Sequence, residues 1–120
     1  MLYCGKEGAK LDLQLFIDDL RQPPSEEWVV VRSFDEALTF FDRHGIPQRI
    51  SFDHDLGEQQ GQLLPTGMDI AKAMVEGVLD GRYTLPDGFS YQVHSANPVG
   101  RANIIGLMDG LLRYVSLERT

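Results

Sequence analysis

Four short apolar runs, separated by longer amphipathic segments, set the pattern of the sequence. Runs of this length that are bounded by polar and turn-forming residues predict strands. The first is apolar enough to be buried on both faces, whereas the last alternates as a half-exposed edge strand does. The four predicted strands are Leu11–Ile17, Trp28–Val31, Arg49–Phe52 and Phe89–His94.

Three amphipathic segments have helical spacing and begin at residues that favour N-caps. Ser33 and Glu36 have the spacing of a capping box, and Gly45 marks the end of this first helix. Thr66 is the expected cap of the second helix and Asn97 that of the third. The positions expected to face the core are Ile70, Met74, Val75 and Val78 in the second helix and Ile104, Met108, Leu111 and Val115 in the third.

The order of these elements predicts a mostly parallel sheet, because strand and helix alternate from the second strand onward. The connection between the first and second strands is the exception. It holds Pro23 and Pro24 and leaves room for little more than a loop or a single short turn. A length of 120 residues suits one core, so we expect residues 1–120 to form a single domain.

Charge and composition narrow the class of protein. A net charge of −7 argues against a protein that grips extended nucleic acid, because that mode needs a basic face. An anionic ligand would need a local basic cluster or a metal ion. No apolar run reaches the length of a membrane span, and the first residues lack the apolar core of a secretory signal, so we expect a cytoplasmic protein with no membrane partner. Cys4 is the lone cysteine and cannot form an internal disulfide, and nothing in the sequence requires an oligomer.

Polar residues gather where three of the predicted strands end. In an open parallel sheet these ends share one edge, where ligands usually bind. Clustered carboxylates would raise one another's pKa unless a cation lay among them, and oxygen ligands favour Mg²⁺ or Mn²⁺. A structural alternative is that each aspartate only caps the turn after its strand. The residues are Asp18 and Asp19 after the first strand, Asp53 and Asp55 after the third, and His94 and Ser95 after the last.

Two histidines and two arginines complete the candidate site. If their strands are neighbours, His54 and His94 face each other across a phosphate, one taking a proton from water and the other protonating the leaving oxygen. Metal ligation and a purely structural role are the alternatives for both. Arg101 lies in the first turn of the last helix, where a cation is unfavourable unless a phosphate binds there. Arg21 is placed to act as a second clamp, or is simply an exposed loop arginine.

The segments "FIDDLR", "SFDHDLG", "TG" and "HSANPVGR" resemble the receiver domains of two-component signalling. In that resemblance Asp18 and Asp19 are the metal-binding acids, Asp53 the phosphoacceptor and Ser95 the hydroxyl. The chain departs from receivers in lacking a full first helix, a fifth strand and the lysine of that strand. The resemblance implies a small three-layer, receiver-like (flavodoxin-like) α/β fold with a mostly parallel sheet of four strands in the order 2-1-3-4.

The complete set of motifs resembles more closely the cyclic-phosphate processing receiver domain. This resemblance implies a metal-dependent phosphoesterase that acts on cyclic phosphates, such as the 2′,3′-cyclic phosphate of a nucleotide or RNA end, or on other cyclic nucleotides. Two alternatives remain: a signalling module phosphorylated on Asp53, and a non-catalytic phosphate- or nucleotide-binding domain. The implied roles are Mg²⁺ or Mn²⁺ ligands for Asp18, Asp19, Asp53 and Asp55, catalytic groups for Asp53, His54, His94 and Ser95, and substrate contacts for Arg21, Asn97 and Arg101.

Overall fold

The computed structural model describes residues 13–118. Cys4 and the first two residues of the predicted Leu11–Ile17 strand lie outside this part of the chain. In chain order the elements are β1 (Gln14–Ile17), β2 (Trp28–Val31), α1 (Phe34–His44), β3 (Arg49–Phe52), β4 (Glu58–Gln59), β5 (Gln62–Leu63), α2 (Gly67–Leu79), β6 (Ser90–Val93) and α3 (Pro98–Glu118).

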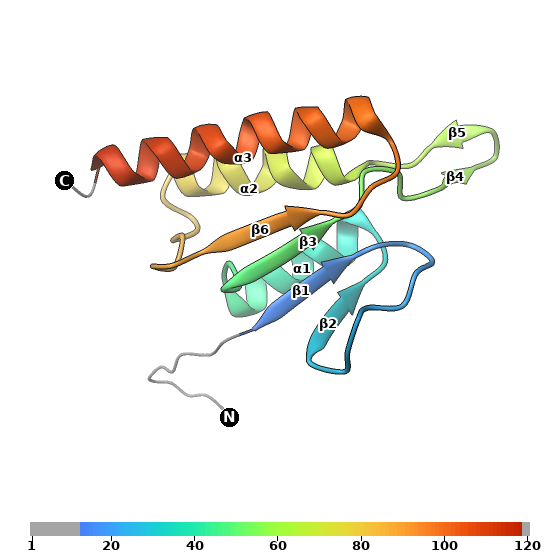
Figure 1. The fold of residues 1–120 in the computed structure, drawn as a ribbon, viewed down its shortest axis with the longest axis horizontal. Coiled ribbons are helices and arrows are strands. Elements are labelled where there is room, and N and C mark those ends of the chain that lie inside the picture. The colour runs from blue at the N-terminus through green and yellow to red at the C-terminus, as the bar shows by residue number, and fades with distance from the viewer. Residues whose placement is uncertain (1–12, 119–120) are drawn as a thin grey trace.

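The main sheet of the described chain has four parallel strands in the order β2-β1-β3-β6 (Figure 1). Since β6 is the fourth strand of this sheet along the chain, the predicted order 2-1-3-4 is confirmed. Ile17 pairs with Phe52, and Phe52 pairs with Val93, so β1, β3 and β6 end in register. The receiver-like α/β class is therefore confirmed.

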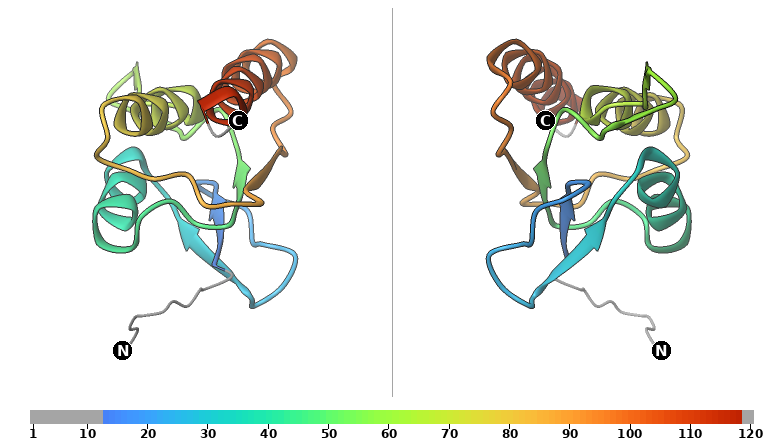
Figure 2. Two further views of the ribbon diagram at one scale, coloured as in Figure 1. Left: turned by 90° about the vertical axis from the view of Figure 1, so that its left-hand side faces the viewer. Right: turned by 90° about the vertical axis from the view of Figure 1, so that its right-hand side faces the viewer.

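The helices of the described chain all lie on one face of the sheet (Figures 1 and 2). The crossovers from β2 to β3 and from β3 to β6 run in the same direction across the sheet, and right-handed crossovers in one direction place their helices on one face. The crossover from β1 to β2 runs the other way, but residues 18–27 form a loop, as predicted from the two prolines. The described chain therefore has two layers in place of the three layers that were expected.

The apolar core fills the space between the sheet and the helices. Leu15, Ile17, Ile50 and Phe52 are fully buried in it. The helix positions that were predicted to face the core do so. Those that are buried are Ile70, Met74, Ile104, Met108, Leu111 and Val115, and those that are partly buried against the same cluster are Val75 and Val78.

The predicted cap residues hold the starts of the helices. Ser33 Oγ accepts from the backbone N–H three residues on, over 3.2 Å, and Thr66 forms a complete capping box. Asn97 Oδ1 likewise accepts from the N–H three residues on, over 2.9 Å. Glu36 Oε1 accepts from the N–H of Arg32 and not from the N–H of the cap residue Ser33. Of the two hydrogen bonds of the capping box predicted for the first helix, only the one to Ser33 Oγ therefore forms. None of the described helices has the length and apolar composition that a membrane crossing needs.

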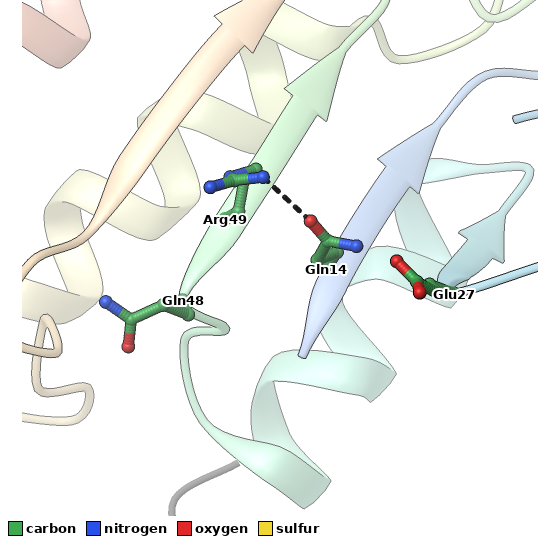
Figure 3. A pocket seen from close by; sticks show the side chains of 4 residues that line it. All are labelled: Gln14, Glu27, Gln48 and Arg49. Atoms are coloured by element: carbon green, nitrogen blue, oxygen red, sulfur yellow. Dashed lines mark hydrogen bonds between the residues drawn. The ribbon is translucent and has the colours of Figure 1, made fainter. Parts of the chain in front are cut away.

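Polar side chains occupy the sheet face on which no described helix packs. Gln14, Arg49 and Gln92 are at least partly exposed there, and Arg49 Nη1 donates to Gln14 Oε1 over 2.9 Å (Figure 3). An open cavity of about 540 Å³ lies at the amino-terminal ends of the strands and is lined by Gln14, Glu27, Gln48 and Arg49. Their polar composition allows these residues to remain in contact with water.

A short hairpin that was not predicted follows β3. Its strands, β4 and β5, pair antiparallel around Gln60 and Gly61, whose φ angles are 53° and 78°. Positive φ at both central residues is typical of the two-residue type I′ turn. The sequence did not indicate it because each strand has two residues without apolar alternation, and Gln-Gly is a weaker turn signal than Asn-Gly.

Substitution of Gly67 tests the close approach of α2 to the end of β3. A Cβ atom at this position would lie 1.8 Å from the backbone oxygen of Asp53, so Gly67→Ala forces the two segments apart. We expect a loss of about 1–3 kcal/mol in the free energy of unfolding, measured by urea denaturation. Gly106→Ala in α3, where a Cβ atom would meet nothing within 4 Å, is the control and should stabilise the protein by up to about 1 kcal/mol. Equal effects of the two changes would contradict this account of Gly67.

Candidate functional site

Three side chains meet at the carboxyl end of the sheet. Because β1, β3 and β6 end in register, Asp18, Asp53 and His94 each follow a paired residue directly. The N–H of Asp53 donates to Ile17 O and the N–H of His94 to Phe52 O, each over 2.9 Å. One carboxylate oxygen of each aspartate and one ring nitrogen of His94 lie within 4.8 Å of one another. We call Asp18, Asp53 and His94 the strand-end cluster.

Asp18 is buried with several hydrogen-bond donors around it. Its side chain is 1% exposed, and Oδ1 accepts from the N–H groups of Leu20 and Arg21 over 2.9 Å each. Burial alone would raise its pKa, but these N–H groups and the ring of His94 together hold the pKa of Asp18 below its ordinary value. Asp18 is therefore an ionised carboxylate, which can only accept hydrogen bonds.

The ring of His94 is held on three sides. Nε2 lies 2.9 Å from Asp18 Oδ2, and Nδ1 lies 2.7 Å from Ser51 Oγ. One face stacks on Phe16, with 4.4 Å between ring centroids and 3° between the ring planes. Ser51 is fully buried and also accepts a hydrogen bond from Gln92 Nε2 over 3.2 Å. Since both ring nitrogens have partners, His94 would have to give up one of them to exchange a proton with a ligand.

Asp53 is the second buried carboxylate of the cluster. Its side chain is 8% exposed, and its Oδ1 accepts from the N–H of His54 over 2.9 Å. Burial and, after it, the negative charge of Asp18 raise the pKa of Asp53. A cation bound between the two carboxylates would remove the repulsion between them.

His54 belongs to a second hydrogen-bonded group. Nδ1 lies 2.9 Å from Asp55 Oδ1, and Asn97 Nδ2 donates to Asp55 Oδ2 over 3.4 Å. The hydrogen bond from His54 is the main cause of the lowered pKa of Asp55. The ring packs on α3 at Gly100, where a Cβ atom would lie 2.3 Å from the ring Cγ. The side chain of Asp55 thus faces His54 and Asn97 and lies outside the strand-end cluster.

Asp19 also lies apart from the strand-end cluster. Its Oδ2 is beside Gly57, where a Cβ atom would lie 3.1 Å away. Gly57 has a φ of 95°, a conformation that favours glycine. Of the four acids predicted to bind metal, the structure brings together Asp18 and Asp53.

Both arginines predicted to contact phosphate lie beside the end of β6. Arg21 Nη1 donates to His94 O over 2.8 Å, and its Nε lies 3.9 Å from Asp18 Oδ2. Arg101 Nε donates to Val93 O over 3.4 Å. Both side chains are exposed and retain further N–H groups that can donate to a ligand. Arg21 therefore borders the cluster, and Arg101 is bound to the residue before His94, in a chain that is acidic as a whole.

Ser95 lies in the turn that leads into α3. Its Oγ accepts from the N–H of Asn97 over 3.1 Å, which leaves the hydroxyl hydrogen able to donate. The amide of Asn97 is used twice, because Oδ1 caps α3 and Nδ2 donates to Asp55.

Four side chains of the site were not predicted from the sequence. Ser51, a polar residue inside an apolar run, is the one that had a visible signal. Phe16 contacts His94, and Gln92 contacts Ser51, only because their strands pair with β3 in this register. Arg32 holds the loop after β1, since its Nη1 donates to Asp18 O over 3.2 Å and to Arg21 O over 2.7 Å.

The strand-end cluster could hold a divalent metal ion. Asp18 and Asp53 offer carboxylate oxygens, and His94 offers a ring nitrogen. Carboxylates suit Mg²⁺ and Mn²⁺, while imidazole suits Mn²⁺, Zn²⁺ and Fe²⁺ better than Mg²⁺. Burial and the nearby charge of Asp18 raise the pKa of Asp53, and a cation bound in the cluster would oppose this rise.

A parallel sheet in this order, with buried aspartates after its first and third strands, defines a receiver-like domain. Residues 13–110 match the cyclic-phosphate processing receiver domain, and the chain belongs to this family. The resemblance noted from the motifs is thereby confirmed. Searches of curated proteins and of solved structures gave no match.

Substitution of Asp53 tests the electrostatics of the cluster. Asp53→Asn keeps the acceptor for the N–H of His54 but removes a buried negative charge. The pKa of Asp53 is raised in the folded state, so its ionisation opposes folding above the ordinary carboxylate pKa. We therefore expect the variant to be more stable than the metal-free wild type by on the order of 1 kcal/mol at neutral pH.

The gain from Asp53→Asn should shrink as the pH falls through the raised pKa of Asp53 toward the ordinary carboxylate pKa, because the wild-type carboxyl then becomes neutral. Thermal unfolding in chelator across this pH range measures it. Asp35→Asn, at an exposed acid in the first turn of α1, is the control and should give no gain at any pH. A loss of stability in Asp53→Asn at neutral pH would show that the repulsion is not present.

Proposed function

We propose that the protein is a metal-dependent phosphoesterase that acts on cyclic phosphates, such as the 2′,3′-cyclic phosphate of a nucleotide or RNA end. The observation that carries the proposal is the meeting of two buried aspartates with His94, near two arginines that bind the end of β6, in a member of the cyclic-phosphate processing receiver family. The partner is then a phosphorylated small molecule or an RNA end, and not extended nucleic acid.

Asp18 and Asp53 are the residues that would hold Mg²⁺ or Mn²⁺. When bound there, such an ion supplies a positive charge that polarises the phosphoryl group and lowers the pKa of a water molecule. Asp18 is already ionised and anchored by two N–H groups, so it needs no rearrangement to bind a cation. Asp19 and Asp55 are not among the residues that would hold the ion.

Arg21, Arg101 and Ser95 supply the donors for the phosphate oxygens. The two guanidinium groups reach the end of β6 from opposite segments of the chain, the loop after β1 and the first turn of α3. The Ser95 hydroxyl lies between these segments in sequence and can donate its hydrogen. Donors arranged around phosphate stabilise the charge that develops in the transition state.

His54 is the better placed of the two histidines to exchange a proton with the substrate. Asp55 accepts at Nδ1 and so favours the tautomer that leaves a lone pair on Nε2. No hydrogen bond to Nε2 of His54 is recorded within residues 13–118, so this atom can take a proton from water. Asp55 is then a positioning residue that acts through His54, as a carboxylate does beside a catalytic histidine.

The central test is turnover. The purified protein is incubated with 2′,3′-cyclic and 3′,5′-cyclic nucleotides, cyclic-ended RNA and acetyl phosphate, with Mg²⁺, Mn²⁺ or chelator. We expect hydrolysis of a 2′,3′-cyclic ester with metal and none with chelator. His54→Ala should lower kcat by about 10²–10⁴-fold, the usual contribution of a general base. His44→Ala, at the far end of α1, is the matched control and should leave kcat unchanged.

The outcomes separate the alternatives. Turnover of no ester with any metal would overturn the proposal in favour of a binding domain. Stable labelling of Asp53 by acetyl phosphate without turnover would favour a signalling module. Labelling that precedes turnover would indicate a covalent route in which Asp53 attacks phosphorus.

Metal binding can be measured without substrate. Mg²⁺ or Mn²⁺ at about 100 times its dissociation constant should stabilise the wild type by about 2.7 kcal/mol, because it binds only the folded state. Asp18→Asn and Asp53→Asn should each lose most of this gain in thermal unfolding experiments, while Asp35→Asn should retain it. Equal stabilisation of all four proteins would place the metal elsewhere.

A further inference from the structure

The hydrogen bonds around His94 form a chain that begins on the exposed side of the sheet. Gln92 Nε2 lies 3.2 Å from Ser51 Oγ, Ser51 Oγ lies 2.7 Å from His94 Nδ1, and His94 Nε2 lies 2.9 Å from Asp18 Oδ2. Ser51 and Gln92 are paired residues of adjacent strands, so the sheet itself sets their contact. The chain joins the exposed Gln92 to the buried Asp18.

The donors and acceptors of this chain permit one direction only. The amide nitrogen of Gln92 can only donate, so it uses a lone pair of Ser51 Oγ. The Asp18 carboxylate can only accept, so His94 Nε2 must carry a hydrogen. A neutral ring then has a bare Nδ1, which accepts the hydroxyl hydrogen of Ser51. In this arrangement each of the three contacts pairs one donor with one acceptor, whereas a hydrogen on Nδ1 in place of Nε2 would leave the contact between His94 and Asp18 without a donor.

We propose that Ser51 and Gln92 are positioning residues that act together with Asp18 to hold His94 in the tautomer with its proton on Nε2, and that they thereby make the strand-end cluster prefer a cation with oxygen ligands. The preference for a cation rests on the proposed function; the tautomer does not. With a proton on Nε2, the ring nitrogen beside Asp18 has no lone pair to give to a metal, and the carboxylates of Asp18 and Asp53 remain as ligands. A metal that seeks imidazole, such as Zn²⁺, requires the proton to move to Nδ1.

Moving that proton costs the chain a hydrogen bond. With a hydrogen on Nδ1, Ser51 Oγ receives two donors, from His94 and from Gln92, and its own hydrogen has no acceptor within the chain. Residues that orient a ligating histidine typically change metal affinity by about 10–100-fold. Residue 92 is exposed and can be changed without disturbing the core. A substitution there therefore tests how the hydrogen-bond chain affects the metal affinity of the cluster.

Gln92→Glu favours the opposite direction at the Ser51 end of the chain, while Asp18 still favours a hydrogen on Nε2. A carboxylate at this position accepts the hydroxyl hydrogen of Ser51, whose lone pair then accepts from Nδ1–H of His94. Ser90→Glu is the matched control, because it adds the same charge two residues earlier on the same face of β6 without a contact to Ser51. Circular dichroism verifies that both variants remain folded.

Two-bond ¹H–¹⁵N correlation spectra of metal-free protein read the tautomer of His94 directly, and His94→Gln identifies its signals. In the pH range where the ring is neutral, we expect a hydrogen on Nε2 and none on Nδ1 in the wild type and in Ser90→Glu. Gln92→Glu should carry a hydrogen on Nδ1 in a larger fraction of molecules, because the new carboxylate accepts from Ser51 and frees its lone pair for Nδ1–H. A hydrogen on Nδ1 in the wild type, or no change in Gln92→Glu, would overturn the inference whether or not the protein hydrolyses any ester.

The metal preference is measured by calorimetric titration with Zn²⁺ and with Mg²⁺. Gln92→Glu should raise the ratio of Zn²⁺ to Mg²⁺ affinity by about tenfold or more, and Ser90→Glu should leave it unchanged. The same rise in both variants would mean that added charge alone is responsible, and would overturn the role assigned to Ser51 and Gln92. Because no substrate is present, failure here and failure of the hydrolase proposal remain distinct.

Discussion

The candidate site depends on one constraint, the register in which β1, β3 and β6 end. Pairing of Ile17 with Phe52 and of Phe52 with Val93 fixes Asp18, Asp53 and His94 as the next residues in a row. Side chains alternate along a strand, so a slip of β6 by one residue would turn His94 to the other face. The backbone hydrogen bonds that continue past the strands to Asp53 and His94 extend this order into the site. The register of the sheet thus determines which side chains meet at the site.

The parts of the fold that depend on local sequence could be predicted. Strand ends, caps such as Thr66 and Asn97, and the buried faces of α2 and α3 all follow from spacing within a dozen residues. The strand order followed from the resemblance to receivers, but the same resemblance led to a third layer that the described chain lacks. The contacts of Ser51 and Gln92 could not be predicted, because they require the register of two strands some forty residues apart. Asp55 illustrates the same limit, since whether it turns to the cluster or to His54 depends on the placement of α3.

The structure separates two histidines that looked equivalent in the sequence. His94 continues a central row of the sheet, stacks on Phe16 and has partners at both nitrogens. His54 points toward α3, where the absence of a side chain at Gly100 makes room for its ring, and has its single recorded side-chain partner in Asp55. A ring with partners at both nitrogens must give up one of them to exchange a proton, whereas a ring with a partner at one nitrogen can exchange a proton at the other. The two histidines therefore have different surroundings, and the acid and base pair expected from the sequence stays a prediction.

The loop that replaces a helix after β1 connects the architecture to this chemistry. A helix packed on that face would cover β1 and β3 and would favour apolar residues at positions 14, 49, 51 and 92, as buried parallel sheets usually have. With no described helix there, Gln14, Arg49 and Gln92 can contact water, and a row of polar side chains can cross the sheet to reach His94. Phe16 remains buried on this face because the rings of Trp28 and His94 cover it. The missing layer thus leaves one sheet face free for hydrogen bonds that a fully covered sheet would have little reason to contain.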